Sequence, residues 1–185
     1  MPRHPPSTVG TGAGGAPPAI FLMGAIGAGK TTLGRALARQ LGGGHVEGDD
    51  YHRPPLPWFA TSLSTSRAVL QAVLAHAAAG RPAVVSYPLR CREWIFYRRR
   101  LAEAGIRSAF VSLAACEDAL LAEDRGRRFS PEEKRRIRDM LREGYGDRPF
   151  ADLVVRTDRG SADEALVRLV SALEQLGFGH RFPPS

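Results

Sequence analysis

The apolar and polar positions at the beginning of the chain follow the order strand, loop, helix. The apolar run 19–23 stops at Gly24, which is typical of a buried parallel strand that ends in a loop. From Lys30 onward apolar residues recur at helical spacing, and three glycines at 42–44 end this helix. The apolar positions of the predicted helix are Leu33, Ala36, Leu37 and Leu41.

Strand and helix patterns alternate along the rest of the chain. Short apolar runs predict strands at about 45–47, 83–86, 107–113 and 152–156. Helical spacing predicts helices at about 63–77, 94–101 and 161–176, a short one from Glu117, and one that begins at Ser130. Five alternations predict an α/β fold, a three-layer α/β/α sandwich around a five-stranded parallel sheet. In such a sheet the ligand lies beyond the carboxyl ends of the strands.

The composition is that of an ordinary globular chain of one domain. Residues 1–18 are rich in Pro, Gly and Ser and predict a disordered leader, 19–176 a single domain, and 177–185 a tail. No apolar run is long enough to cross a bilayer, and no signal-peptide pattern precedes the domain. We therefore expect a cytoplasmic protein, with Cys91 and Cys116 as reduced, partly buried thiols.

Residues 24–31 match the motif G-x-x-x-x-G-K-[ST] at every fixed position, between the predicted strand and helix. Its backbone N–H groups and the helix start would bind phosphates. Lys30 would bridge the β- and γ-phosphates, and the Thr31 hydroxyl would bind magnesium. The alternative is a glycine-rich turn without a ligand. The motif predicts a P-loop NTPase that binds ATP with Mg²⁺ through Gly24, Ala25, Ile26, Gly27, Ala28, Gly29, Lys30, Thr31 and Thr32.

Lysine is rare in a chain that is otherwise rich in basic residues. Lys30 and Lys134 are the two lysines among 26 basic residues, and the formal net charge is +7. A compact ammonium reaches between phosphate oxygens better than the planar guanidinium of arginine does. The scarcity therefore supports a phosphate-binding role for Lys30, whereas the positive charge suits anionic ligands of any kind.

An acidic turn directly follows the second predicted strand. Phosphoryl transfer to a hydroxyl needs a carboxylate that orients the acceptor and takes its proton, and a second acid can assist the metal. Asp49 and Asp50 are the candidates for these two roles, with Asp49 also the candidate metal ligand, and His52 is a candidate acceptor contact. The alternatives are a solvated turn capped by one of the two acids and a structural histidine.

Basic residues follow the third strand and the short helix. Arg90 and Arg92 would reach an anionic acceptor or the γ-phosphate, unless they are surface charges. Many P-loop proteins carry an Asp near the end of the third strand, where this chain has Ser86. The arginines at 125, 127 and 128 surround Gly126 and predict a small lid, in which Arg125 and Arg128 would stabilise charge on the transferred phosphoryl group. The alternative is a basic helix end.

With these residues assembled, the chain resembles the small-molecule P-loop kinases, and most of all the gluconokinases, over roughly 19–176. The loop GAIGAGKT carries the likeness together with EGDDYH, which resembles that family's GDD-aromatic-His segment, and VVSYPLR, which is similar to VV-x-x-S-A-L-K. Residues 148–158 look more like the adenine-side strand of adenylylsulfate and shikimate kinases.

The resemblance implies roles for individual residues. Asp49 or Asp50 would contact the acceptor hydroxyl, Arg90 would stand where the family has Lys, and residues 125–128 would form the lid. Thr157 would border the base, and Arg125 would contact the nucleotide. The implied acceptor is a small metabolite with a hydroxyl group. We expect the protein to be a monomer or a homodimer.

Several function classes remain open at this point. The acceptor could resemble that of gluconokinase, of shikimate or adenylylsulfate kinase, or of an antibiotic phosphotransferase. A nucleotide-binding regulatory or nucleic-acid-associated ATPase is the alternative of another class, which the net charge permits. Nucleic acid is not the expected partner, because no strand interleaves basic and aromatic residues. A switch GTPase is disfavoured because DxxG and NKxD segments are missing.

Overall fold

The five predicted strands form one parallel sheet. The computed structural model describes residues 15–52, 58–122 and 128–178. The strands are β1 (Ala19–Met23), β2 (Gly44–Glu47), β3 (Ala83–Ser86), β4 (Ser108–Ala114) and β5 (Leu153–Arg156). Their order in the sheet is β2-β3-β1-β4-β5, and every pair is parallel. Because β1 is central, the loop that follows it lies at the middle of the carboxyl edge.

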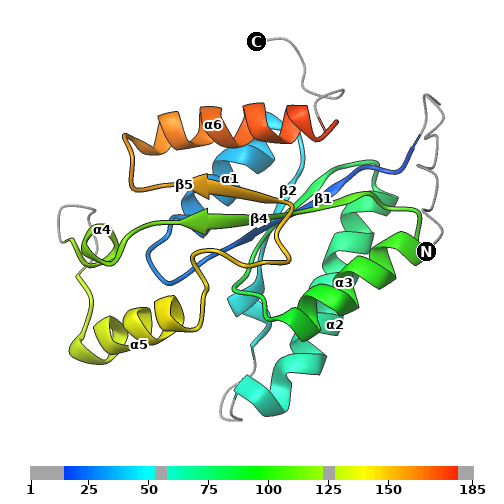
Figure 1. Ribbon diagram of the computed structural model, residues 1–185. Coiled ribbons are helices and arrows are strands. Elements are labelled where there is room, and N and C mark those ends of the chain that lie inside the picture. The colour runs from blue at the N-terminus through cyan, green and yellow to red at the C-terminus, as the bar shows by residue number, and fades with distance from the viewer. Residues whose placement is uncertain (1–14, 53–57, 123–127, 179–185) are drawn as a thin grey trace, which may run out of the picture.

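Helices cover both faces of this sheet, as the alternating pattern predicted (Figure 1). One face packs against α1 (Lys30–Gln40) and α6 (Ala162–Gln175), and the other against α2 (Trp58–Ala78) and α3 (Cys91–Glu103). Two further helices, α4 (Glu117–Leu121) and α5 (Pro131–Arg142), lie beyond the carboxyl ends of the strands. The predicted three-layer α/β/α sandwich is therefore confirmed.

Alternation along β1 divides the core between the two faces. Ile20 and Leu22 belong to the cluster that includes α1 and α6, whereas Phe21 packs on the side of α2 and α3. The Phe21 ring stacks on Phe110 at 4.7 Å and meets Tyr97 at 4.9 Å between ring centroids. Burial of each such aromatic side chain contributes on the order of 1.5–3 kcal/mol to the free energy of unfolding. The packing holds β1, and with it the following loop, rigidly in place.

Helix starts follow the sequence signals closely. Ser130 caps α5 by accepting a hydrogen bond from the Glu133 N–H at 3.2 Å, while the Glu133 carboxylate accepts one from the Ser130 N–H at 3.0 Å. Ser161 and Glu164 form the same reciprocal pair at the start of α6. Each such cap stabilises its helix by about 1 kcal/mol.

Some details differ from the sequence prediction. The acidic turn forms a short 3-10 helix, Gly48–Tyr51, and the fourth strand begins and ends one residue later than predicted. Both cysteines are free, as expected, but they are exposed and not partly buried. The leader prediction lies outside the described residues except for 15–18, and so does most of the predicted tail, 179–185. Within the described part of the chain, no helix has the length and apolarity that a membrane span requires.

Candidate functional site

The loop between β1 and α1 has a backbone conformation that only glycine readily adopts. Gly29, which precedes the first residue of α1, has a φ of 88°. Gly24 has a φ of 149°, and a Cβ atom there would lie 2.7 Å from the Leu113 carbonyl oxygen. The loop is therefore packed against β4 and leads into the N-terminus of α1, where free N–H groups and the helix dipole favour an anion.

The Lys30 side chain folds back over this loop. Its Nζ donates hydrogen bonds to the carbonyl oxygens of Gly24, at 3.0 Å, and Ala25, at 2.8 Å. These bonds hold a positive charge above the loop, on the side where the helix N-terminus is also positive. The two features reinforce each other as a site for phosphate groups.

The Thr31 hydroxyl meets a carboxylate that the sequence analysis did not select. Thr31 Oγ1 donates to Glu47 Oε2 at 2.7 Å, from the first turn of α1 to the end of β2. Burial raises the pKa of Glu47, and the nearby Asp49 raises it further, while the Thr31 bond and Lys30 lower it. Hydroxyl and carboxylate oxygens are the ligands Mg²⁺ takes beside phosphates and water, so this donor set fits magnesium.

These residues surround a pocket of about 410 Å³ on the carboxyl edge. Asp49 also lines this pocket. Leu120 and Phe129 also line the pocket, and they lie on either side of the segment 123–127, which is outside the described residues. The complete lining is Ile26, Gly27, Gly29, Lys30, Thr31, Thr32, Glu47, Asp49, Leu120 and Phe129.

A second pocket, of about 360 Å³, adjoins the first. The two share Ile26 and Asp49, so these two residues stand at their junction. Predicted acceptor contacts His52 and Arg90 line this second pocket. The complete lining is Ile26, Asp49, His52, Tyr87, Pro88, Arg90, Glu93, Arg136, Met140 and Tyr145. The arrangement brings the pocket of the P-loop motif and a second, polar pocket together at Asp49.

Helix α5 and the turn after it supply one wall of the second pocket. Arg90 Nε donates to the Tyr145 hydroxyl at 3.2 Å, which links the start of α3 to the segment after α5. The Arg148 guanidinium lies over the Tyr145 ring at 3.7 Å from its centroid. Arg136 reaches the pocket from α5 and forms an ion pair with Glu143 at 3.0 Å. Sequence reasoning missed Arg136 and Tyr145, because both lie in a charged stretch that is also typical of a solvated helix.

Tyr87 contributes a phenol to the same pocket. Its ring packs directly on the backbone of the acidic turn, since a Cβ atom at Gly48 would lie 2.2 Å from the ring. Burial, with a further contribution from the Asp49 charge, raises the pKa of Tyr87 to about 12. The hydroxyl is therefore protonated at neutral pH and able to donate a hydrogen bond to a ligand.

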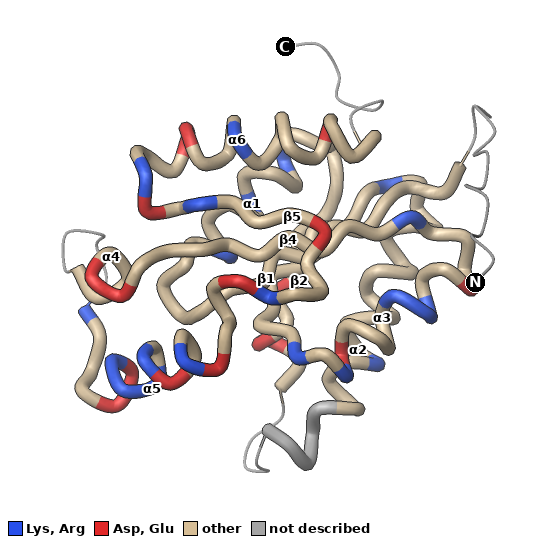
Figure 2. Tube along the Cα trace, in the orientation of Figure 1, with Lys and Arg blue, Asp and Glu red and all other residues tan. Residues whose placement is uncertain are grey.

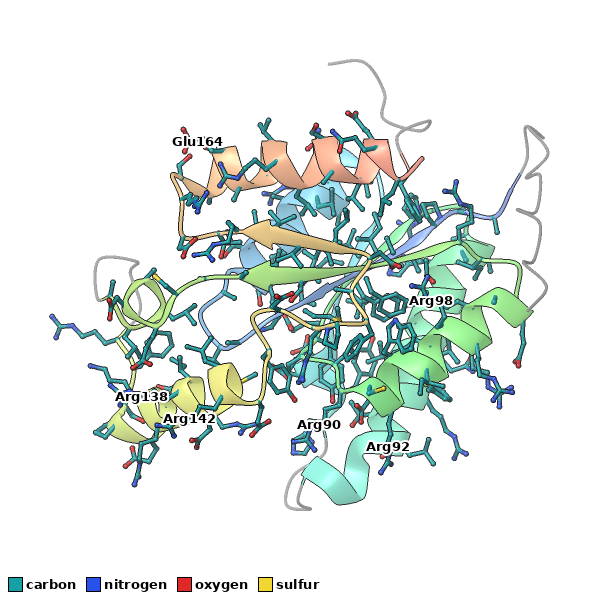
Figure 3. All side chains as sticks on the ribbon, in the orientation of Figure 1. Arg90, Arg92, Arg98, Arg138, Arg142 and Glu164 are labelled. Atoms are coloured by element: carbon teal, nitrogen blue, oxygen red, sulfur yellow. The ribbon has the colours of Figure 1, made fainter. Side chains whose placement is uncertain are left out.

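Other predicted site residues lie elsewhere. Asp50 and Arg92 are exposed and line neither pocket, and Figure 3 shows Arg92 projecting from the start of α3. Arg128 is also exposed and lines neither. Thr157 is buried beyond β5, with its hydroxyl 3.4 Å from the Ala114 carbonyl oxygen to which it donates. Arg125 lies outside the described residues, so its lid role stays a prediction.

The charges of α5 help to interpret the basic stretch after the predicted lid. Figure 2 shows positive and negative residues interleaved along this helix. Arg135 pairs with Glu132 at 3.5 Å and Arg142 with Asp139 at 3.2 Å, all on the exposed surface. Such pairs are worth little individually. One face of this helix is therefore solvated, and Arg136 is the arginine of α5 that lines the second pocket.

Comparison of the sequence with known proteins gives a short local match. No protein-family model matches the chain. A shikimate kinase of Psychrobacter cryohalolentis is 59% identical over 34 residues, which is 18% of this chain and 18% of that enzyme. A shikimate kinase of Psychrobacter arcticus gives the same values. The match therefore spans less than a fifth of the length of this chain and of each of these two enzymes.

Comparison of the structure gives matches over nearly the whole fold. The APS kinase of Mycobacterium tuberculosis, solved with AMPPNP and APS, superposes with a TM-score of 0.65 at 20% identity, over 87% of this chain and 99% of that one. A gluconokinase from Sinorhizobium meliloti 1021 superposes with a TM-score of 0.60 at 24% identity, over 89% of this chain and 98% of that one. Shikimate kinase from Acinetobacter baumannii, solved with shikimate, superposes with a TM-score of 0.59 at 24% identity, over 86% of this chain and 94% of that one. The predicted likeness to these three kinds of P-loop kinase is confirmed at the level of the fold.

Proposed function

We propose that this protein is an ATP-dependent kinase that transfers the γ-phosphoryl group to a hydroxyl of a small polar metabolite. The observation that carries the proposal is the position of Asp49 at the junction of two pockets. A transferase needs a donor site and an acceptor site that meet at the reacting atoms, whereas a simple ATPase needs only the first together with water. The fold supports the proposal, because similar structures include three kinds of small-molecule kinase.

The donor side uses the loop and the first turn of α1. Backbone N–H groups of residues 24–32 would bind the phosphates, and Lys30 would neutralise charge on the β- and γ-phosphates. Thr31 and Glu47 would hold Mg²⁺, which supplies charge neutralisation at the phosphates when bound, so that Asp49, also predicted as a metal ligand, is left for the acceptor. Arg125 and Arg128 keep their proposed lid role, which is supported by Leu120 and Phe129, since these flanking residues line the phosphate pocket.

On the acceptor side, Asp49 would accept a hydrogen bond from the attacking hydroxyl and take its proton as the oxygen bonds to the γ-phosphorus. The bond from that phosphorus to the bridging oxygen breaks, and ADP leaves. Arg90, Arg136 and His52 line the pocket beyond Asp49 and suit an anionic group on the acceptor. Pro88 and Met140 offer an apolar wall for its carbon skeleton.

The pocket limits the acceptor to a small metabolite. Its volume of about 360 Å³ lies at the lower end of the range for ligand sites. Sugar acids and cyclic hydroxy acids fit this description, as does adenylylsulfate if part of it lies outside the pocket. We therefore propose an acceptor with at least one hydroxyl and one anionic group.

ADP release by the purified chain, with a panel of hydroxy acids and sugars, tests the proposal. We expect Mg²⁺-dependent turnover that one class of anionic acceptor stimulates at least tenfold. Stimulation by nucleic acid alone, or by no acceptor at all, would show an ATPase of another class and contradict the proposal. The Lys30→Ala variant should lose turnover while keeping its melting temperature, and equal turnover would remove the P-loop assignment.

The two adjacent aspartates provide a sharper comparison. Asp49→Asn should lower kcat by about 10²–10⁴-fold, because the acceptor loses its proton acceptor. Its dissociation constant for ATP, measured by calorimetry, should change far less. Asp50→Asn should affect kcat much more weakly, because Asp50 lines neither pocket. The reverse ranking of the two variants would assign the acceptor carboxylate to Asp50.

A further inference from the structure

Beneath the first turn of α1 lies a polar pair that the proposed reaction does not use directly. Ser86, at the end of β3, is fully buried, and its Oγ donates to the Lys30 carbonyl oxygen at 2.8 Å. His45, on β2, places Nε2 at 2.9 Å from the same Ser86 oxygen. The pair therefore connects two strands of the sheet to the backbone of the P-loop lysine.

The direction of each hydrogen bond follows from the inventory of donors. A serine hydroxyl has one proton, and Ser86 gives it to the Lys30 carbonyl. The Ser86 oxygen must then accept from His45, so Nε2 of His45 carries a proton. In α-helical geometry the Lys30 carbonyl also accepts from the N–H four residues later, which leaves its second lone pair for Ser86.

A glycine inside α1 makes room for this pair. A Cβ atom on Gly34 would lie 2.4 Å from Ser86 Oγ and 2.7 Å from His45 Nε2. Glycine in a helix interior costs about 1 kcal/mol relative to alanine, so its presence in this turn needs a reason. Here the helix must approach the two polar side chains closely enough for Ser86 to reach Lys30.

We propose that Ser86 and His45 are positioning residues that fix the backbone of Lys30 and, through it, the phosphate-binding groups of the first turn of α1. Many P-loop proteins have an aspartate near the end of this strand, which helps to bind magnesium. In this chain the serine hydroxyl is directed at the helix backbone, and Glu47, its register partner on β2, bonds the Thr31 hydroxyl. This inference rests on the proposed function, because it assigns the pair to nucleotide binding.

Four variants test the proposal in the full chain. Ser86→Ala removes the hydroxyl, His45→Leu removes the ring donor, and His45→Gln keeps an amide donor at a similar distance from the backbone. Ser112→Ala is the matched control, because Ser112 is an equally buried serine on β4 whose hydroxyl has no hydrogen-bond partner within the described residues.

ATP is the probe, and its dissociation constant is measured by calorimetry with Mg²⁺ present. We expect Ser86→Ala and His45→Leu to bind ATP about tenfold more weakly, the effect of one lost hydrogen bond of typical strength. The KM for the acceptor should remain within about twofold, since neither residue lines the acceptor pocket. His45→Gln should recover most of the affinity, and Ser112→Ala should bind like the wild type.

Unchanged ATP affinity in both Ser86→Ala and His45→Leu would overturn the proposal. Equal weakening in Ser112→Ala would overturn it as well, because the effect would then be a general loss of sheet stability. A His45→Gln variant no better than His45→Leu would remove His45 from the inference.

Hydrogen exchange separates this inference from the proposed function. If the wild type binds no ATP, the proposed function fails, but the amides of Leu33 and Gly34 still report on positioning, because they bond the Gly29 and Lys30 carbonyl oxygens. They should exchange faster in Ser86→Ala than in the wild type or in Ser112→Ala. Equal exchange in all three proteins would overturn the positioning role on its own.

Discussion

Gly34→Ala is the substitution for which helix propensity and packing predict opposite results. Propensity alone favours alanine by about 1 kcal/mol in a helix interior. The added methyl group, however, would meet Ser86 Oγ at 2.4 Å and the His45 ring at 2.7 and 2.9 Å. Real Cβ atoms essentially never approach other atoms below 3.0 Å, so the helix or the two side chains must move.

The net magnitude follows from these two effects. Overpacking a well-packed site costs about 1–3 kcal/mol, and one contact below 3.0 Å with the buried Ser86 and two with the half-buried His45 place this site near the upper end. After subtraction of the propensity gain, we expect a net loss of about 1–2 kcal/mol. For a chain of this size that corresponds to a melting temperature lower by about 2–8 °C.

Thermal and urea unfolding of Gly34→Ala measure this loss, with Gln40→Ala as the control. Gln40 is an exposed residue of the same helix, so its substitution changes propensity without a new contact. In the double variant Gly34→Ala/Ser86→Ala the nearest clashing atom is gone. Its destabilisation should be smaller than the sum of the two single effects, by about 1 kcal/mol.

A stability equal to or above that of the wild type would refute the reasoning for Gly34→Ala, because helix propensity would then outweigh the contacts. Strict additivity in the double variant would show that the methyl group does not meet Ser86. Either result would place α1 farther from β2 and β3 than the structure does, and it would weaken the positioning role of the His45–Ser86 pair.

Three further predictions concern individual charged groups. Glu47→Gln should leave the melting temperature of the nucleotide-free protein equal or higher, because burial raises the pKa of Glu47 and disfavours its charge. The Mg²⁺ concentration for half-maximal turnover should rise about tenfold. A Mg²⁺ requirement unchanged within twofold would remove Glu47 from the metal site. Arg136→Gln should raise the KM for the acceptor about tenfold without changing the KM for ATP. Arg135→Gln, on the exposed side of α5, is the control and should change neither KM. Equal effects of the two substitutions would refute the assignment of Arg136 to the pocket. The Arg156 hydrogen bond holds the pKa of Asp158 well below its usual range, so the carboxylate stabilises the fold above about pH 4 and this contribution is lost as the pH falls. Asp158→Asn should therefore lower stability by about 1–2 kcal/mol at pH 7 and by much less near pH 2, and a pH-independent difference in urea unfolding would contradict this.

Local signals in the sequence were sufficient for the elements and for the loop proposed as the donor site. The apolar run of β1, the fixed glycines and the Lys30–Thr31 pair lie within thirteen consecutive residues, so strand, loop and helix start could be read together. The same holds for the caps at Ser130 and Ser161, whose partners are three residues away. Patterns of this kind need no knowledge of distant contacts.

The proposed acceptor side could be predicted only in part. His52 and Arg90 were selected because they follow strands whose carboxyl ends meet at one edge, and both line the second pocket. Arg136 and Tyr145 come from a helix and a turn beyond the sheet, where no strand end points to the site. Asp49 and Asp50 are neighbours in sequence and equivalent as residue types. The short 3-10 helix turns Asp49 toward both pockets and leaves Asp50 outside their linings.

By itself, then, the sequence determined the α/β fold, the phosphate-binding loop and the edge of the sheet where the chemistry would lie, because these follow from periodicity and from spacing along the chain. The tertiary structure decided that Glu47 bonds Thr31, that Asp49 stands between the two pockets, and that Ser86 and His45 support Lys30. These contacts join residues 16 to 56 positions apart in the chain. They depend on strand order and register, which hydrophobic patterns do not specify.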